Sequence, residues 1–478
     1  MKYTRRHMMQ FAAAGALVGC APAIRQSYAA DVIIIGAGLS GLHAARLLAS
    51  DGARVLVLEE SNRIGGRVLT LDDVPGRPEG GGQQVGQTYA RIRATSRDLG
   101  INVIGYPPQD RNVSLCVAGR VMPASEWATA PENPFSGMFK SLTPSAALLV
   151  AAGRNNPFDN NEAWRELSPE LDVSADAWLM AQGFDERSRQ LMDVSLNGTS
   201  LDTYSMANLW RSLTLYREDA SLGPSDRIEG GSSRLTEAMG ASLPAGTIRL
   251  GAGVSSITDR GDHAEVQTGR DTLRAPFVIC TIPFSGIRNR VEITGPDGDP
   301  NRAARTDAIA GLPYTPIQQI HLIPENRFWE TDGLPIDMWT DSPIERVFTN
   351  YDDAGEVASL TCWINGSSVS ETMSDNDLFA LASSELSRMR GAKVRGSRVV
   401  RWDRLQPLSG GAYMHWAPGQ IGRWAIQMAA PAGRIHFAGE HLSFLHTGME
   451  GAMESGEWTA FEVMQRMAQS AQPDQIGR

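Results

Sequence analysis

The chain has 478 residues, of which 42% are hydrophobic and 21% are charged, so it is long enough for two domains with large cores. Its formal net charge is −10, and about −14 without the first thirty residues, which argues against nucleic acid as a partner. The four cysteines lack metal-ligand spacing, so no metal site is predicted, while a disulfide stays open for an oxidising compartment. They are Cys20, Cys116, Cys280 and Cys362.

The first thirty residues have the features of an export signal. Thr4–Met9 is a twin-arginine pattern, and the weakly apolar run Phe11–Val18 is too short to span a bilayer. Small residues before Ala30 suit cleavage by a signal peptidase. Leu17–Cys20 also resembles a bacterial lipoprotein box, so a lipid anchor at Cys20 is an alternative, and a frayed basic helix is a third. We expect a periplasmic protein whose mature chain has no transmembrane span.

The stretch from Asp31 to Glu59 predicts a strand, a tight turn, a helix and a second strand. Val32–Ile35 is a short apolar run, typical of a strand buried on both faces, and Val55–Leu58 is the next strand. Three glycines lie between them in G-x-G-x-x-G spacing: Gly36, Gly38 and Gly41. They allow a pyrophosphate to approach the N-terminus of a helix over 40–50, and Glu59 can accept both hydroxyls of a ribose. This pattern predicts a dinucleotide site.

Two more glycine-rich segments follow. Arg63–Arg67 contains a glycine pair, and Arg67 is predicted to pair with the phosphates of the same ligand. Glu79–Gly86 contains three consecutive glycines, which indicates a second close approach, here to a flat ring. Gly82 and Gln83 are the contacts that we predict there.

The middle of the chain alternates between two kinds of pattern. Residues 87–225 have helical periodicity, with helices expected near 90–99, 173–182 and 184–194. Strands are expected at 247–254, 263–268, 277–283 and 317–323, and a helix at 378–390. Val254, which ends the first of these strands, is predicted to contact the dinucleotide. No internal repeat or low-complexity linker interrupts the chain.

Motifs near both ends of the chain resemble the flavin-containing amine oxidases, a family that includes monoamine oxidases, polyamine oxidases and L-amino-acid oxidases. The N-terminal motifs are GAGLSGLHAARLL from Gly36, VLVLEESNRIGGRV from Val55 and EGGGQQVG from Glu79. The C-terminal motifs are RIHFAGEH from Arg434 and GMEGAMESG from Gly448. The resemblance implies FAD as cofactor and a small-molecule amine as substrate.

The resemblance also implies an α/β fold made of two interleaved domains. A Rossmann-type FAD-binding domain, of the GR2-like flavoprotein kind, is expected from residues 31–86, 226–285 and 395–470. An α+β substrate-binding domain is expected from residues 87–225 and 286–394. The family's flavin cradle falls on the C-terminal segment, where a strand ends at Phe437. Gly439 and Glu440 would pass beside the pyrophosphate, and a helix starting near Met449 would present N–H groups to the flavin.

The resemblance places an aromatic cage around Tyr413. In the monoamine oxidases a cysteine before this tyrosine bonds covalently to the flavin, and Ala412 stands there, so non-covalent FAD is expected. Tyr413 is expected to hold the amine against the flavin face, with Trp402 as a further catalytic-site residue. The second tyrosine of the cage falls at Gly448. The candidates to replace it are Trp416, Phe444 and His446, and ordinary core packing is the alternative for both tryptophans.

Two further positions depart from the family. A lysine linked to oxygen reactivity falls at Gln319, so the electrons go either to O₂ or to another acceptor such as a redox protein or a quinone. The arginine that binds the substrate carboxylate in L-amino-acid oxidases falls at Gln84, which favours an amine without an α-carboxylate. An arginine from the substrate-binding domain would reverse that preference.

The sequence therefore favours an exported FAD-dependent amine oxidase or dehydrogenase that forms an imine, which then hydrolyses. An L-amino-acid oxidase, and a desaturase or protoporphyrinogen-type oxidase of the same fold, are the alternatives within the fold. A non-catalytic flavoprotein that traps a ligand is the alternative from another class. His441 and His446 are either general bases or structural hydrogen-bonders. The oligomeric state is open, and a homodimer is compatible with the sequence.

Overall fold

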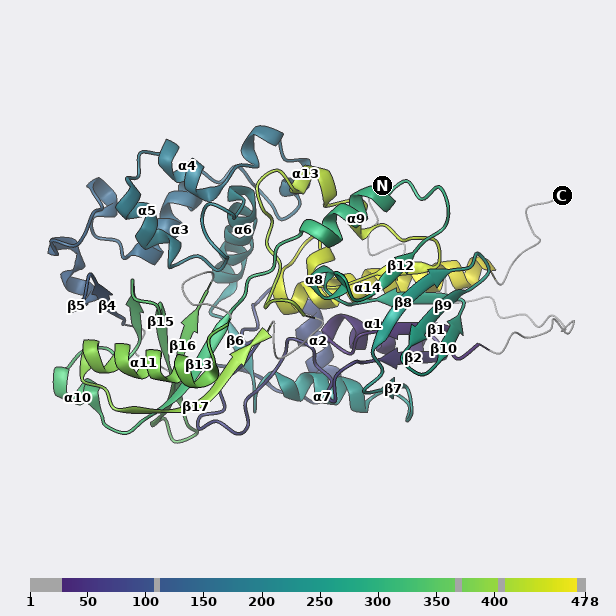
Figure 1. Cartoon of the computed structure of the whole chain (residues 1–478), viewed down its shortest axis with the longest axis horizontal. Coiled ribbons are helices and arrows are strands. Elements are labelled where there is room, and N and C mark those ends of the chain that lie inside the picture. The colour runs from purple at the N-terminus through teal and green to yellow at the C-terminus, as the bar shows by residue number, and fades with distance from the viewer. Residues whose placement is uncertain (1–27, 107–111, 366–371, 403–408, 471–478) are drawn as a thin grey trace, which may run out of the picture.

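The computed structural model describes residues 28–106, 112–365, 372–402 and 409–470. The predicted export signal and Cys20 lie outside these residues, apart from the last three positions of the signal. Figure 1 shows the chain in two parts, with strands β1 and β2 and the C-terminal helix α14 in one and strands β13, β15, β16 and β17 in the other. Within the described residues, no helix is both long enough and apolar enough to cross a membrane.

A parallel five-stranded sheet forms the centre of the first part, in the order β18-β11-β1-β2-β7. The strands are β1 (Val32–Ile35), β2 (Val55–Leu58), β7 (Ile248–Arg249), β11 (Phe277–Cys280) and β18 (Ile435–Phe437). Every residue of β1, β11 and β18 is buried, as the apolar runs predicted. The sheet joins segments from both ends of the chain, which confirms the predicted Rossmann-type α/β fold.

Two helices from opposite ends of the chain pack closely beside this sheet. They are α1 (Leu39–Ser50) and α14 (Gly448–Ser470). A Cβ on Gly456 of α14 would lie 2.4 Å from the backbone oxygen of Ser40 in α1. A Cβ on Gly41 would lie 2.0 Å from the Gly36 oxygen, so the third glycine of the motif allows the helix to meet the turn.

Smaller elements complete the first part. A four-stranded sheet has the order β10-β9-β8-β12, and β3 pairs with β6. These strands are β3 (Val103–Gly105), β6 (Asp226–Ile228), β8 (Val254–Asp259), β9 (Ala264–Thr268), β10 (Thr272–Ala275) and β12 (Glu292–Thr294). The helices are α2 (Ala90–Asp98), α7 (Ser233–Ala241), α8 (Phe284–Ile287), α9 (Arg302–Gly311), α13 (Ile421–Trp424), η6 (Gln427–Ala429) and η7 (Glu440–Leu442).

The second part is built on a seven-stranded sheet of order β17-β13-β16-β15-β14-β4-β5. Its strands are β4 (Ser114–Val117), β5 (Arg120–Pro123), β13 (Gln318–Pro324), β14 (Met338–Thr340), β15 (Arg346–Tyr351), β16 (Val357–Ile364) and β17 (Val394–Arg401). Helices α10 (Phe328–Asp332) and α11 (Asp375–Arg390) share one apolar cluster with it. A helical region contains η2 (Ala124–Thr129), η3 (Gly137–Phe139), α3 (Pro144–Arg154), η4 (Ala163–Glu166), η5 (Pro169–Leu171), α4 (Ala175–Ala181), α5 (Glu186–Asp193) and α6 (Met206–Leu222).

Three expectations from the sequence need correction. Strand β17 pairs with β13 in the seven-stranded sheet, so the chain returns to the nucleotide-binding part after Arg401 and not at 395. Residues 87–225 are not only helical, because β4 and β5 extend the same sheet. The strand expected at 247–254 is two strands, since Gly251 has a positive φ of 62° that ends the extended backbone between β7 and β8.

Candidate functional site

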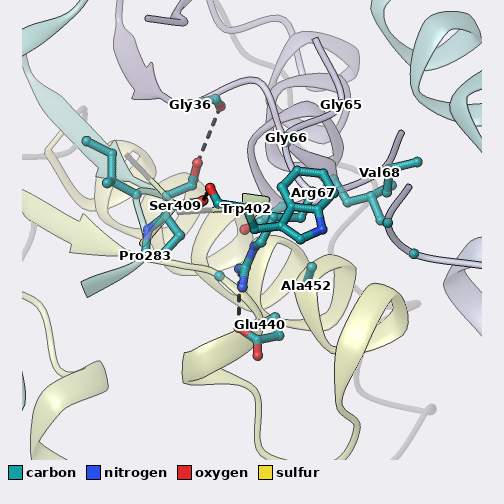
Figure 2. Close-up of a pocket in the computed structure, with 18 of the residues that line it drawn as sticks. Gly36, Gly65, Gly66, Arg67, Val68, Pro283, Trp402, Ser409, Glu440 and Ala452 are labelled. Atoms are coloured by element: carbon teal, nitrogen blue, oxygen red, sulfur yellow. Dashed lines mark hydrogen bonds and ion pairs between the residues drawn. The ribbon is translucent and has the colours of Figure 1, made fainter. Parts of the chain in front are cut away.

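A cavity of about 280 Å³ lies where segments from both ends of the chain meet the seven-stranded sheet. Gly36 and Gly439 line the same cavity, although they are far apart in the sequence. Figure 2 shows Gly36 and Gly65, from two separate turns near the N-terminus, around the same pocket as Glu440 and Ala452 from the C-terminal region. The two sets of predicted motifs therefore line one common cavity.

One end of the cavity is lined by the turn between β1 and α1. The Glu59 carboxylate accepts hydrogen bonds from the backbone N–H of Ala37 at 2.8 Å and of Ser61 at 2.9 Å, which fixes it at the carboxyl end of β2. Gly38 faces Gly66 so closely that a Cβ on Gly66 would lie 3.2 Å from the Gly38 Cα. Val254, for which contact with the dinucleotide is predicted, also lines the cavity, as does Ala252.

The first turn of α1 offers polar groups to this end of the cavity. Ser40 lines it, and its hydroxyl is buried without a hydrogen-bond partner among the described residues. A buried polar group without a partner is costly, and a phosphate oxygen at the helix N-terminus would satisfy it. The glycine backbone, Ser40 and Glu59 thus fit the pyrophosphate and ribose of a dinucleotide.

Arg67 joins the two halves of the cavity wall. Its guanidinium contacts the Glu440 carboxylate at 3.2 Å and donates to the Ala412 oxygen at 3.0 Å, and Figure 2 shows it directed at Glu440. Glu440 also accepts from the backbone N–H of Met414 at 2.9 Å. Arg67, for which the sequence predicted pairing with phosphates, therefore uses two N–H groups within the protein to hold the C-terminal segment in place.

The other end of the cavity is flat and aromatic. It is lined by Gln319, Trp363, Trp402, Ala412 and Tyr413. A Cβ on Gly81 would lie 2.7 Å from the Trp402 ring, and a Cβ on Gly82 would lie 2.7 Å from the Met449 sulfur. Only glycine backbone fits at these two positions, and we call the space lined by Gly81, Gly82, Trp402 and Tyr413 the slot.

Two buried polar atoms at this end have no hydrogen-bond partner among the described residues. They are the side-chain oxygens of Gln319 and Tyr413. Burial raises the pKa of Tyr413, with the positive charge of Arg346 acting against that shift, so the phenol stays neutral. The Gln319 amide and the Tyr413 phenol can therefore hydrogen-bond to a cofactor or substrate without adding a charge.

Several predicted residues lie outside the cavity lining. Gln83 and Gln84 are exposed and neither lines it, and Gly41 serves the packing of α1. The candidates for the second cage wall also face elsewhere. Trp416 packs against Trp164 and Phe444 lies under Arg165, while His446 meets Tyr89 edge-on. Of the predicted wall positions, Gly448 itself is the one that lines the cavity.

His441 is a structural residue in this arrangement. Its ring is buried between Phe284 and Tyr314, with no hydrogen-bond partner among the described residues, and it does not line the cavity. Burial, together with the charge of Arg67, lowers the pKa of His441 to about 3, so the ring is neutral at physiological pH. Sequence reasoning missed Ser40, Thr281, Trp363 and Ser409, which also line the cavity. Ser40 occupies a variable position of the G-x-G-x-x-G segment, and the other three stand in no pattern that marks them.

The three free cysteines of the described residues are buried and take no part in the site. They are Cys116, Cys280 and Cys362, which pair in no disulfide. Burial raises the pKa of Cys280 and of Cys362 to about 12, which keeps these thiols protonated and unreactive. The buried, inert character predicted for Cys280 is confirmed.

The arrangement as a whole fits FAD. Glu59 and the glycine turn suit the ADP half, and the slot between the Gly81–Gly82 backbone, Trp402 and Tyr413 suits a flat ring system. A long ligand with one polar and one planar end would fill both.

Comparison with known proteins agrees with this geometry. The family model for flavin-containing amine oxidoreductases matches residues 39–464. An amine oxidase [flavin-containing] of Oncorhynchus mykiss is 25% identical over 92% of this chain and 87% of its own length. An L-amino-acid oxidase of Siganus canaliculatus is 27% identical over 89% of this chain and 83% of its own.

Solved structures with the same fold include cyclohexylamine oxidase from Brevibacterium oxydans IH-35A, with a TM-score of 0.75 and 21% identity. The alignment covers 92% of this chain and 99% of that one. Putrescine oxidase bound to putrescine follows with a TM-score of 0.73 and 21% identity, over 91% of this chain and 99% of that one. The chain belongs to the flavin-containing amine oxidoreductase family.

Proposed function

We propose that the protein binds FAD and oxidises a small-molecule amine to an imine, which water then hydrolyses. The observation that carries this proposal is the single cavity in which the dinucleotide turn at Gly36, the C-terminal segment at Gly439 and the aromatic residue Tyr413 meet. Bound FAD supplies the acceptor for the hydride equivalent of the amine. No charged acid or base is needed at the reacting carbon.

The residues of the slot bind and orient the amine. The Tyr413 ring attracts an amine nitrogen by its negative face, and Trp402 closes the neighbouring side. The buried phenol and the Gln319 amide are both neutral, so the slot favours the uncharged amine over the ammonium form. An uncharged amine is the form that can lose hydride.

The cofactor is proposed to be held without a covalent bond. Ala412 lines the slot where the monoamine oxidases carry the cysteine that bonds to the flavin, and alanine has no group that forms such a bond. Acid precipitation of the yellow protein should release the FAD into the supernatant. A yellow pellet would contradict non-covalent binding.

The electron acceptor is proposed to be a quinone or redox protein, with O₂ reacting slowly. Gln319, which lines the slot, stands where the family carries the lysine linked to oxygen reactivity. The test is reoxidation of the reduced protein by air and by a ubiquinone analogue, followed by stopped flow. Rapid reoxidation by air with release of H₂O₂ would make the protein an oxidase.

Export to the periplasm is proposed from the twin-arginine pattern, which precedes the described residues. Replacing Arg5 and Arg6 by lysines should leave the FAD-loaded protein in the cytoplasm. If Cys20 carries a lipid anchor, replacing Cys20 by alanine should change the mass of the periplasmic protein. If the signal is cleaved near Ala30, the mass should stay the same. A homodimer stays a prediction, which sedimentation of the holoprotein would measure.

The decisive experiment is anaerobic reduction of the purified holoprotein by a panel of amines. Bleaching of the flavin absorbance by at least one amine, and not by polyenes or porphyrinogens, supports amine oxidation over a desaturase or protoporphyrinogen-type activity. A folded protein that is colourless, or whose flavin no amine reduces, contradicts the proposal.

A further inference from the structure

A half-buried arginine, Arg346, stands beside the aromatic end of the cavity. Arg346 opens strand β15, directly opposite Trp363 of β16, which in turn is opposite Gln319 of β13. Directly opposite residues of antiparallel strands project from the same face of a sheet. Gln319 and Trp363 both line the cavity, so Arg346 continues their row, about 4.8 Å beyond Trp363 across one strand spacing.

The guanidinium of Arg346 has one edge without a partner. Nη1 donates to the side-chain oxygen of Asn197 at 3.0 Å, but Nε and Nη2 are buried and have no hydrogen-bond partner among the described residues. These two nitrogens form one side of the planar group. Their N–H bonds run parallel, the arrangement that receives both oxygens of one carboxylate.

The neighbours of Arg346 do not supply the missing acceptor. Trp339 and Trp363, on either side of it in the row, present indole rings, which donate hydrogen bonds and do not accept them. The preceding residue, Glu345, is buried just before strand β15 with a positive φ of 50°, and its carboxylate accepts from the backbone N–H of Asn365 at 2.7 Å.

The charge of Arg346 reaches the place where the amine is expected. It acts on the buried Tyr413 phenol, whose pKa it moves downward against the effect of burial. Desolvation also lowers the pKa of Arg346, against the effects of Tyr413 and Glu345. A further negative charge at the free edge of the guanidinium would offset that desolvation, and an anionic ligand can supply it.

We propose that Arg346 is a carboxylate-binding residue of the substrate cavity, and that the amine substrate carries a carboxylate group. This inference rests on the proposed amine oxidation and narrows its substrate class. It replaces the preference for a substrate without an α-carboxylate, which rested on Gln84, an exposed residue outside both the lining and the row of Gln319 and Trp363 that Arg346 continues. Asn197 is a positioning residue that holds the guanidinium through Nη1.

The first test measures binding without any amine chemistry. Isothermal titration of the oxidised holoprotein compares phenylacetate and hexanoate with their neutral amides. The wild type should bind each acid more tightly than its amide, and R346M should weaken acid binding about 100-fold, as expected for the loss of a bidentate charged pair, while leaving amide binding unchanged. R346K should be intermediate, because lysine keeps the charge and loses the parallel pair of N–H bonds.

A matched control is R395M, because Arg395 is an exposed arginine on strand β17 of the same sheet. R395M should bind both acids as the wild type does. Equal binding of acid and amide by the wild type, no binding of either acid, or unchanged acid binding by R346M would each overturn the carboxylate site.

The second test identifies where the carboxylate lies relative to the amine. Anaerobic flavin reduction compares L-phenylalanine with phenethylamine, and 6-aminohexanoate with hexylamine. Faster reduction by L-phenylalanine than by phenethylamine indicates an α-carboxylate. Faster reduction by 6-aminohexanoate than by hexylamine indicates a distal carboxylate. R346M should abolish either preference. Reduction by the plain amines alone, with no effect of R346M, contradicts the carboxylate site but leaves amine oxidation intact. Acid binding through Arg346 with no reduction by any amine contradicts the proposed function alone.

Discussion

The ring and the hydroxyl of Tyr413 can make separate contributions to amine oxidation. Its ring lines the slot, whereas its hydroxyl has no hydrogen-bond partner among the described residues. Replacing Tyr413 by phenylalanine should change the rate of flavin reduction less than about threefold, because the ring face remains. Replacing it by alanine should lower the ratio of the flavin-reduction rate constant to the substrate dissociation constant about 10- to 100-fold. Stopped-flow reduction measures both, and a large effect of the phenylalanine variant would assign the contribution to the hydroxyl instead.

Three buried histidines predict how stability responds to acid. Burial lowers the pKa of His321 to about 3, of His415 to about 4 and of His441 to about 3. In the unfolded chain each of these histidines takes up a proton as the pH falls below its ordinary pKa of 6.5. In the folded protein the ring stays neutral until the pH approaches the lowered pKa. Their contribution to stability is therefore complete above pH 6.5 and is lost progressively as the pH falls toward 3.

At pH 5 the loss should be about 2 kcal/mol for each of these histidines relative to pH 7. Urea unfolding at the two pH values measures it. The difference in unfolding free energy between the two pH values should be smaller in H415Q than in the wild type by about that amount, because glutamine does not titrate. Glutamine can still hydrogen-bond to Thr315, which contacts the His415 ring at 3.1 Å. An identical pH dependence in H415Q and the wild type would contradict a neutral, buried His415.

At the scale of elements, the contact between α1 and α14 holds the cavity together. Gly456 of α14 meets the Ser40 backbone, and the first turns of both helices line the cavity. G456A should force the helices apart, destabilise the fold by about 1–3 kcal/mol and weaken FAD binding. The control is G422A in α13, where an added Cβ meets nothing within 4 Å and the φ angle is ordinary. Thermal unfolding and FAD titration compare the two, and equal behaviour would exclude a tight contact at Gly456.

The elements that the sequence predicted well are those whose pattern is local. The runs at β1 and β2, the glycine spacing between them and helix α11, with its capping box at Ser374 and Gly391 at its C-terminus, carry their own signals. Strands β15 and β16 escaped because their buried and exposed residues do not alternate regularly, although they pair with each other locally. Arg346 escaped because only the register of β13, β16 and β15 places it beside Gln319.

At the scale of the whole molecule, the cofactor should act as a structural part of the fold. The cavity is bounded by both parts of the chain, so a ligand that fills it binds the folded state and not the unfolded one. Removing FAD should lower the midpoint of thermal unfolding, and adding FAD at 1,000 times its dissociation constant should restore about 4 kcal/mol. FMN should restore much less, because it lacks the adenosine that Glu59 is placed to hold. Equal rescue by FMN would contradict the role given to Glu59.

Strand β18, at one edge of the central sheet, and helix α14, which lines the cavity, both lie near the end of the described chain. During synthesis, β1 and α1 are therefore made long before β18 and α14. The complete FAD cavity can form only after the C-terminal segment has been synthesised, so full enclosure of the flavin follows that step.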